Sequence, residues 1–250
     1  MSVSAPLEAL LKHPALWQGR RQLHTDKESL STGHARLDAV LPSHGWPVGA
    51  LTEIMAANEG IGELSLLMPA LHTLTRQQQW IALVAPPYIP YAPALTAAGI
   101  ALERILIVDS EFNSNTGNGN KQQDDFWATE QLLRSGIFSA VILWTARGSN
   151  DRQQRRLQLA AEQGKAWAVC YRPEHVVKSA SPASLRMTLR NHQKHLQIDI
   201  IKNRGGKLHT LELLKPNEQD NETPQANNSA QITSIAGTTR NHKSNNDCAV

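Results

Sequence analysis

The sequence predicts a three-layer α/β domain with a mostly parallel central sheet and an antiparallel C-terminal extension. Between residues 31 and 182, strand-like apolar runs alternate with helix-like amphipathic segments, which is the rhythm of a helix-covered parallel sheet. Several runs are apolar at every position, as expected for strands covered on both faces. After Pro182 the pattern becomes hairpin-like, which predicts antiparallel strands added to the same sheet.

Each element follows from its own local pattern. The parallel strands are expected at 50–55, 80–85, 104–109, 138–144 and 166–171. The helices between them are expected at 62–75, 92–98, 126–134 and 152–163. The antiparallel strands are expected at 185–190, 197–202 and 207–214. The first helix shows the basis of these assignments, because its leucines recur at helical spacing along one stripe.

The chain divides into three regions that differ in composition and apolar periodicity. Residues 1–30 carry Leu7, Leu10 and Leu11 at helical spacing and then a polar stretch, which predicts an N-terminal helix and a linker. Residues 31–214 form the α/β domain. Residues 215–250 are rich in polar residues and predict a disordered tail, since they cannot bury enough apolar surface to offset their ordering entropy. The similar stretch 113–125 predicts a surface loop.

Composition excludes several function classes. Of 250 residues, 40% are hydrophobic and 19% charged, as in ordinary globular proteins. A net charge of +3 is too weak to indicate a dedicated nucleic-acid binder. Cys170 and Cys248 lie in no metal-binding motif, and no histidine pair has zinc-site spacing. The sequence shows neither a signal peptide nor a membrane span, so we expect a cytoplasmic protein. Because metal-binding motifs are absent, we also expect no bound metal.

The segment after the first parallel strand resembles a phosphate-binding loop in position but not in chemistry. Such a loop needs glycines for backbone approach, a lysine for the phosphates and a hydroxyl for Mg²⁺. The matching positions here hold residues that lack these groups, namely Ala57, Gly60, Gly62, Glu63 and Leu64. Glu63 would repel a triphosphate, although it would stabilise the N-terminus of the following helix. We therefore expect a tight strand-to-helix turn and no bound nucleotide; a remodelled ligand loop is the alternative.

The surrounding residues resemble the RecA superfamily over residues 31–214. The matching segments are Ser31-Thr32-Gly33, Leu37-Asp38, Gly45-Trp46-Pro47-Val48-Gly49, Glu53-Ile54, Ala98-Gly99-Ile100, Arg134-Ser135-Gly136 and Lys202-Asn203-Arg204. The resemblance implies a RecA-like core. It also implies two further losses, because Pro87 stands at the position of the catalytic carboxylate and Trp144 at the acid that closes the Walker B strand. We therefore expect no enzymatic activity and no cofactor; an unusual ATPase is the alternative.

Within that superfamily the chain resembles the ImuA family most. The matching segments include Gly60-Ile61-Gly62-Glu63-Leu64, Leu67-Met68-Pro69-Ala70-Leu71, Pro90-Tyr91-Ala92-Pro93-Ala94-Leu95 and Arg155-Arg156-Leu157-Gln158-Leu159. This resemblance implies an accessory role in SOS-induced translesion DNA synthesis, through contacts with an ImuB-type polymerase subunit and RecA. The alternative is the sister family SulA, which resembles residues 66–173 and implies inhibition of the division protein FtsZ. The upstream block 31–53 favours ImuA.

Several residues are candidates for partner contact. Lys202 and Arg204 match basic residues that reach a neighbour's nucleotide in RecA filaments; alternatively they are solvated charges. We expect the apolar face made by Leu7, Leu10 and Leu11 to pack either on a partner or on the α/β domain of the same chain. Trp46 lies in a predicted loop and is the tryptophan we expect to contact a partner; the others are expected to lie in the core.

A basic stretch follows the strand 138–144. Its arginines are Arg147, Arg152, Arg155 and Arg156. They could contact DNA phosphates or an acidic partner, but a solvated helix face is the favoured interpretation. Any association with DNA is therefore expected to be indirect.

Overall fold

A computed structural model describes residues 28–58, 60–109, 121–145, 149–192 and 195–214. The centre of this part is an eight-stranded sheet with strand order β10-β9-β8-β3-β7-β6-β4-β5. Its strands are β3 (Ala50–Ala56), β4 (Trp80–Val84), β5 (Ile105–Val108), β6 (Phe138–Trp144), β7 (Trp167–Pro173), β8 (Leu185–His192), β9 (His195–Asn203) and β10 (His209–Leu214). Strands β3 to β8 pair in parallel, whereas β9 and β10 pair antiparallel. The predicted mixed α/β class with an antiparallel extension is confirmed.

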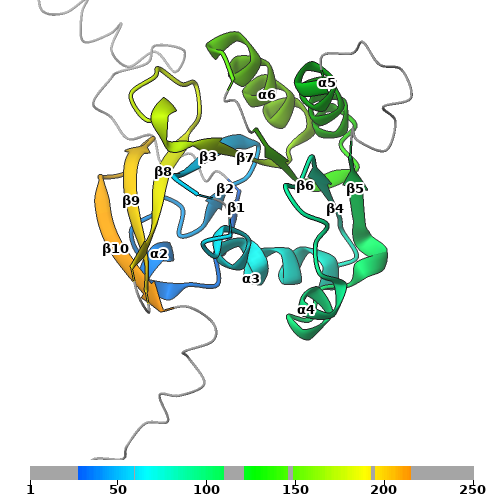
Figure 1. Cartoon of the computed structure of the whole chain (residues 1–250), viewed down its shortest axis with the longest axis horizontal. Helices are drawn as coiled ribbons and strands as arrows, with labels where there is room; N and C mark the ends of the chain where they lie inside the picture. Colours follow the sequence, from blue (N-terminus) through cyan, green and yellow to red (C-terminus); the bar gives the residue numbers. More distant parts are fainter. Residues whose placement is uncertain (1–27, 59, 110–120, 146–148, 193–194, 215–250) are drawn as a thin grey trace, which may run out of the picture.

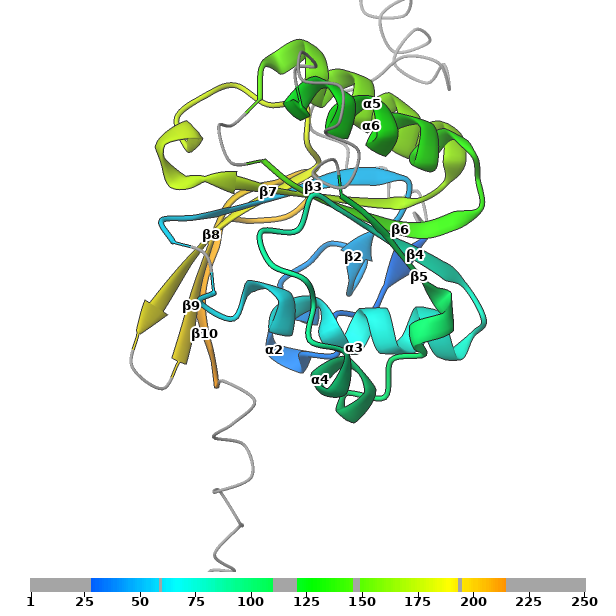
Figure 2. The same ribbon diagram turned by 45° about the vertical axis from the view of Figure 1, so that its right-hand side comes forward.

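Helices cover both faces of the parallel part of the sheet. Figure 2 shows α5 (Lys121–Arg134) and α6 (Asp151–Gly164) on one face, with α3 (Glu63–Arg76) and α4 (Ala92–Ala97) on the other. The short helix α2 (Ala35–Asp38) lies on the side of α3 (Figure 1). Two short 3-10 turns, η1 (Leu102–Arg104) and η2 (Glu174–Val176), complete the described elements. This arrangement gives three layers.

Each helical layer encloses its own apolar core. Successive side chains of a strand point to opposite faces of a sheet, so a continuously apolar strand supplies both cores. In β4, Ile81 and Leu83 pack with the α3 side, while Ala82 and Val84 pack with the α5–α6 side. All four are buried. Because both faces of the central strands are covered, their backbone is rigidly held and positions the turns at their ends.

A short ribbon precedes the sheet and corrects one prediction. Strands β1 (Ser29–Leu30) and β2 (Trp46–Pro47) pair antiparallel, so two residues that the sequence assigned to the linker lie in a strand. Trp46 is fully buried, and its ring stacks on that of Trp167 with centroids 5.1 Å apart. The expectation that Trp46 contacts a partner from a loop is therefore wrong. Its ring contributes to the core because apolar burial of an indole is strongly stabilising.

Helix α5 begins earlier than predicted. The sequence assigned residues 113–125 to a loop, but Lys121–Asp125 form the first turn and more of α5. Asp124 lies in that first turn, where the helix dipole favours negative charge. The predictions for the N-terminal helix, for the tail 215–250 and for the rest of the loop fall outside the described residues.

Candidate functional site

The predicted remnant of a phosphate loop is a single turn between β3 and α3. It brings together Ala57, Gly60, Gly62, Glu63 and Leu64. The two glycines have φ values of 74° and 102°, in the left-handed region that side chains other than glycine rarely adopt. A Cβ at either position would meet no atom within 4 Å, so the backbone conformation and not lack of space requires glycine here.

The side chain of Glu63 folds back onto this turn. The Gly60 N–H donates to Glu63 Oε1 at 3.0 Å, and only 9% of the Glu63 surface is exposed. The N-terminus of a helix attracts anions because its first backbone N–H groups are unpaired. The Glu63 carboxylate therefore occupies the turn before α3 and accepts a hydrogen bond from its backbone. Beside it, the half-buried Leu64 packs against the core and supplies no hydroxyl.

Aromatic rings occupy the ends of the neighbouring strands β6 and β7. The Tyr171 hydroxyl donates to the Glu63 backbone oxygen at 2.7 Å, and burial raises the Tyr171 pKa well above its usual value. Trp144 stacks on Tyr171 with ring centroids 5.1 Å apart. In the described part of the chain, Trp144 Nε1 and Glu63 Oε2 are buried without a hydrogen-bond partner. The ring of Trp144 thus stands at the position to which the resemblance to RecA assigns a metal-binding acid.

The described residues offer little hydrolytic chemistry. Among them, no group of three histidine, cysteine, aspartate or glutamate side chains could hold a metal ion. Burial raises the Cys170 pKa to about 12, so its thiol stays protonated and is a poor nucleophile. Pro87 is exposed and carries no acid or base.

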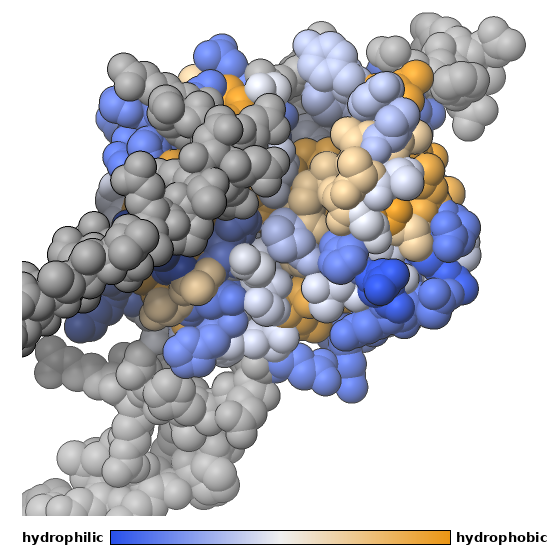
Figure 3. All heavy atoms as spheres, turned by 90° about the horizontal axis from the view of Figure 1, so that it is seen from below, coloured by the Kyte–Doolittle hydropathy of each residue, from blue (hydrophilic) through white to orange (hydrophobic). Residues whose placement is uncertain are grey.

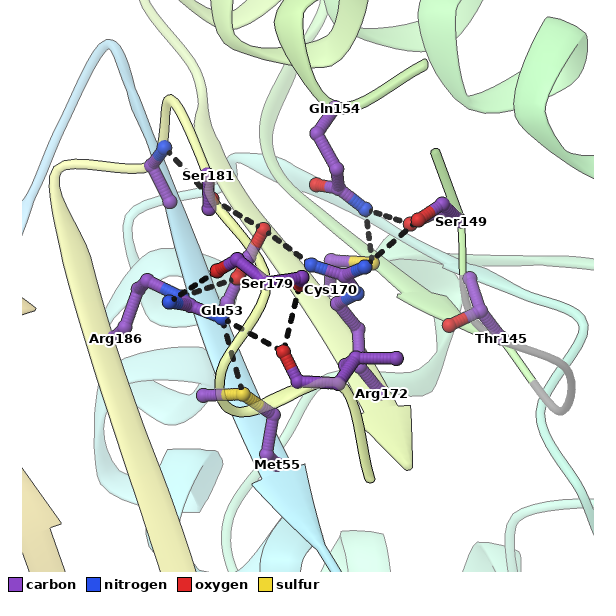
Figure 4. A network of polar contacts seen from close by, with 12 residues as sticks. Glu53, Met55, Thr145, Ser149, Gln154, Cys170, Arg172, Ser179, Ser181 and Arg186 are labelled. Atoms are coloured by element: carbon purple, nitrogen blue, oxygen red, sulfur yellow. Dashed lines mark hydrogen bonds and ion pairs between the residues drawn. The ribbon is translucent and has the colours of Figure 1, made fainter. Parts of the chain in front are cut away.

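A buried ion cluster lies on the other side of β3 (Figure 4). Glu53, in the middle of that strand, is completely buried and accepts hydrogen bonds from two guanidinium groups. Arg172 Nη1 donates at 2.9 Å and Arg186 Nε at 2.7 Å. The Ser181 hydroxyl also donates to Glu53, at 2.6 Å. Two cations on one carboxylate leave a surplus of positive charge inside the fold.

The cluster also holds two loops against the sheet through hydrogen bonds. Arg186 Nη1 donates to the Ser179 carbonyl at 3.0 Å and so holds the segment between η2 and β8. Arg172 Nη2 donates to the Ser149 carbonyl at 2.8 Å, just before α6. The sequence analysis did not identify this cluster. Its signal was present, because charged residues inside apolar strands are costly unless they are paired.

The two predicted contact residues of the C-terminal hairpin behave differently. Lys202 Nζ donates to the Ser181 carbonyl at 2.6 Å, and partial burial, together with the charges of Arg186 and Arg204, lowers its pKa. Lys202 is thus partly used inside the fold. Arg204 lies exposed in the turn after β9, and its backbone N–H donates to the Ser184 carbonyl. The third set, Leu7, Leu10 and Leu11, lies outside the described residues.

The segment that contains α4 carries no charged side chain. No Asp, Glu, Lys or Arg occurs between Arg76 and Glu103. Within this interval the loop before α4 exposes 72% of Tyr88, 80% of Ile89 and 72% of Tyr91. Figure 3 views the molecule from the side of α3 and α4, and pale orange to orange atoms gather there to the right of the centre. Exposed aromatic groups with few charges are typical of protein–protein interfaces. We call residues 85–98 the α4 surface.

Comparison with known proteins connects these features to one family. The family model described as "Cell division inhibitor SulA" matches residues 49–168. By sequence, this part of the chain is similar to SulA proteins. The SulA protein of Yersinia pseudotuberculosis serotype O:1b is 24% identical over 180 residues, which cover 71% of this chain and 98% of the relative. SulA of Yersinia pestis strain Pestoides F is 23% identical over 180 residues, which again cover 71% of this chain and 98% of the relative.

A solved structure also carries the SulA name. The crystal structure of SulA from Pseudomonas aeruginosa matches with 26% identity and a TM-score of 0.38, covering 49% of this chain and 97% of that chain. Residues 49–168, which the family model matches, include the turn between β3 and α3, the α4 surface and helices α5 and α6. The ribbon β1–β2 and the strands β8 to β10 lie outside these residues. None of the described helices is long and apolar enough to cross a membrane.

Proposed function

We propose that this protein is a non-catalytic inhibitor of cell division in the DNA-damage (SOS) response, which acts like SulA by binding FtsZ. The observation that carries the proposal is the similarity to SulA over 180 residues, nearly the full length of those relatives. The turn after β3 supports a role without catalysis, since a glutamate fills it and no phosphate-binding lysine is present. The expected partner is therefore a protein surface and not a small-molecule substrate.

The α4 surface is the face that we assign to this partner. It lies inside the residues matched by the SulA family model. Its exposed apolar groups, Tyr88, Ile89 and Tyr91, project from the described surface without neighbouring charges in the sequence. Burying such rings against a complementary surface would contribute much of the binding free energy, because aromatic side chains dominate interface hot spots.

The proposal is tested by expression in a rod-shaped bacterium. The chain should block division and give filamentous cells. The double variant Tyr88→Asp/Tyr91→Asp should divide normally while reaching the same cellular level, because charges on the α4 surface would be desolvated at the interface. The matched control Arg76→Asp/Lys207→Asp, which alters two other exposed positions, should still give filaments. Normal division with the unchanged chain would contradict the proposal.

A second candidate function is an ImuA-like accessory role in translesion synthesis, with an ImuB-type polymerase subunit and RecA as partners. It is favoured by the segments Trp46-Pro47 in β2 and Lys202-Asn203-Arg204 at the end of β9, which resemble RecA and lie outside residues 49–168 matched by the family model. Arg204 is exposed at the end of β9, as a trans contact would require. The test is calorimetric titration against RecA filaments. Binding that Arg204→Glu weakens would favour this candidate, and no binding would remove it.

A further inference from the structure

The outer face of α5 and α6 carries arginines that are held in place. Glu130 of α5 has a side chain only 4% exposed, and it forms ion pairs with Arg134 one turn later and with Arg156 of α6. The Arg134 Nη2 to Glu130 Oε1 distance is 2.8 Å. Both arginine side chains remain about half exposed, at 45% and 54%. A single buried carboxylate thus fixes two guanidinium groups from adjacent helices at the surface.

Two further arginines extend this face along α6. Arg152 and Arg155 are exposed, and in the described part of the chain no ion pair joins either of them to a carboxylate. Arg152 lies one turn before Arg156, where like charges repel. The acidic side chains Asp151 and Glu162 lie in the first and last turns of the helix. The middle of α6 therefore presents concentrated positive charge, of which Arg152 and Arg155 form no ion pair within the described residues.

Trp127 supplies an aromatic group on the same face. Its side chain is 61% exposed, contrary to the expectation that this tryptophan lies in the core. It precedes Glu130 by three residues and Arg134 by seven, which places all three on one side of α5. Exposing an indole costs apolar hydration free energy without a benefit to folding. The combination therefore indicates a ligand that is both anionic and aromatic.

We propose that the α5–α6 face binds single-stranded nucleic acid. In this arrangement Trp127 stacks on a base, and Arg134, Arg152, Arg155 and Arg156 contact the adjoining phosphates. Stacking on an exposed aromatic ring combined with cations along the backbone is the general chemistry of single-strand binding. Trp127 and Arg134 are separated by about 10 Å along the helix axis, at 1.5 Å per residue, which allows contacts to neighbouring nucleotides.

The site is separate from the α4 surface. Figures 1 and 2 show α5 and α6 side by side on the opposite face of the sheet from α3 and α4. Nucleic acid and a protein partner could therefore be bound at the same time. The inference does not depend on the proposed function, because neither FtsZ nor RecA contacts enter the argument. An acidic protein segment would satisfy the arginines but would leave the exposed indole unused, so nucleic acid is the partner that the residues favour.

The test is fluorescence anisotropy of a labelled oligothymidylate of about 15 nucleotides titrated with the full chain at about 50 mM salt. We expect measurable binding whose affinity falls as salt rises. Arg152→Glu/Arg155→Glu should weaken it by at least about tenfold and reduce the salt dependence, since each lost phosphate contact lowers the slope by about 0.7. Trp127→Ala should weaken it by about tenfold, whereas Trp127→Phe should retain most of the affinity.

The matched control is Arg76→Glu/Lys207→Glu, which changes the net charge equally at exposed positions away from α5 and α6. Binding by this control at nearly the affinity of the unchanged chain supports the proposal. An equal loss in both double variants would show a general charge effect and overturn it. Absence of oligothymidylate binding would also overturn it, and binding of polyglutamate instead would assign the face to an acidic protein. Unfolding curves of each variant identify any that fail to fold. If Trp127→Ala fails to fold, the affinity of Trp127→Phe is compared with that of the unchanged chain instead.

Discussion

Glu53 and Glu63 lie ten residues apart on the same strand–turn–helix unit, yet they stabilise the fold in different ways. Glu63 accepts a hydrogen bond from the Gly60 N–H and remains at the edge of the protein. Glu53 is fully buried and neutralises part of the charge of Arg172 and Arg186. Removing one partner of such a buried cluster is costly, because the remaining charges stay desolvated without compensation.

The first prediction concerns this cluster. Glu53→Gln leaves Arg172 and Arg186 without a counter-charge, and we expect the free energy of unfolding to fall by about 3–5 kcal/mol. Glu103→Gln, an exposed position in η1, should change it by less than about 0.5 kcal/mol. Urea unfolding followed by circular dichroism measures both values. A loss below about 1 kcal/mol for Glu53→Gln would mean that the cluster does not stabilise the fold.

A second prediction concerns His34, which lines a small apolar cavity with Ile61, Leu66 and Leu213. Burial lowers its pKa, although a hydrogen bond with the Leu66 backbone and the Asp38 charge oppose the shift. The unfolded chain therefore binds a proton more readily than the folded one. Stability should fall as the pH decreases through about 6.5, the ordinary histidine value.

The measurement is the free energy of unfolding between about pH 7.5 and pH 5, a range in which histidines titrate. The His34→Gln variant should lose less stability over this range than the unchanged chain. His209→Gln, which replaces an exposed histidine of β10, should retain the original pH dependence. The same pH dependence in all three proteins would contradict the assigned role of His34.

At the level of single residues, the sequence shows which chemical groups a turn carries but not which elements cover a side chain. The turn from Ala57 to Leu64 lacks a lysine and a hydroxyl, which the sequence shows directly. The burial of Trp46 and the exposure of Trp127 depend on which elements cover them. Similarly, the partners of Glu53 come from strands more than 100 residues away, and no local pattern specifies that pairing.

Helices α5 and α6 show how elements depend on one another. Gly164, the last residue of α6, lies so close to α5 that a Cβ there would overlap the Leu133 carbonyl oxygen. Asn150 begins α6 with reciprocal hydrogen bonds to Gln153, a capping box that fixes the start of the helix. The pair is therefore defined at the start of α6 by capping and at its end by close packing.

The third prediction follows from this close approach. Gly164→Ala forces α5 and α6 apart, and we expect a loss of about 3 kcal/mol in the free energy of unfolding, at the upper end of overpacking effects. Gln163→Ala, an exposed neighbour in α6, should change it by less than about 0.5 kcal/mol. Thermal or urea unfolding measures both. Equal stability of the two variants would show that the helices can separate at little cost.

Elements with uniform apolar character were predicted best. The strand expected at 138–144 coincides with β6, and the other parallel strands differ by one or two residues at their ends. The first turns of α5 were missed, because Lys121–Asp125 are polar and resemble the preceding loop in composition. The two-residue strands β1 and β2 are too short for a periodic signal, since they are held by pairing with each other and by burial of Trp46.

The whole molecule combines a rigid sheet with two different outer faces. On one side, α4 and its preceding loop expose aromatic groups without charge. On the other side, α5 and α6 expose arginines around Trp127. Between them, the edge where strands β3, β6 and β7 end is closed by Glu63, Tyr171 and Trp144. The molecule thus presents two chemically different surfaces on opposite faces of its sheet.

The fourth prediction tests that closed edge. A ligand that binds only the folded state raises the melting temperature, and the shift grows with the ratio of ligand concentration to its dissociation constant. Magnesium ATP at about 5 mM should leave the melting temperature unchanged, because Glu63 occupies the turn and residues 57–64 include no lysine, serine or threonine. Differential scanning fluorimetry measures the shift. An increase of several degrees would show that the turn still binds nucleotide, and the non-catalytic interpretation would have to be revised.

The measurement that tests the central claim most directly is sedimentation of purified FtsZ with GTP in the presence of this protein. A SulA-like inhibitor should lower the amount of pelleted FtsZ polymer in proportion to its concentration. The Tyr88→Asp/Tyr91→Asp variant should leave that amount unchanged, because its α4 surface could no longer be buried against FtsZ. Unchanged FtsZ polymer at about a tenfold excess of the folded protein would contradict the account.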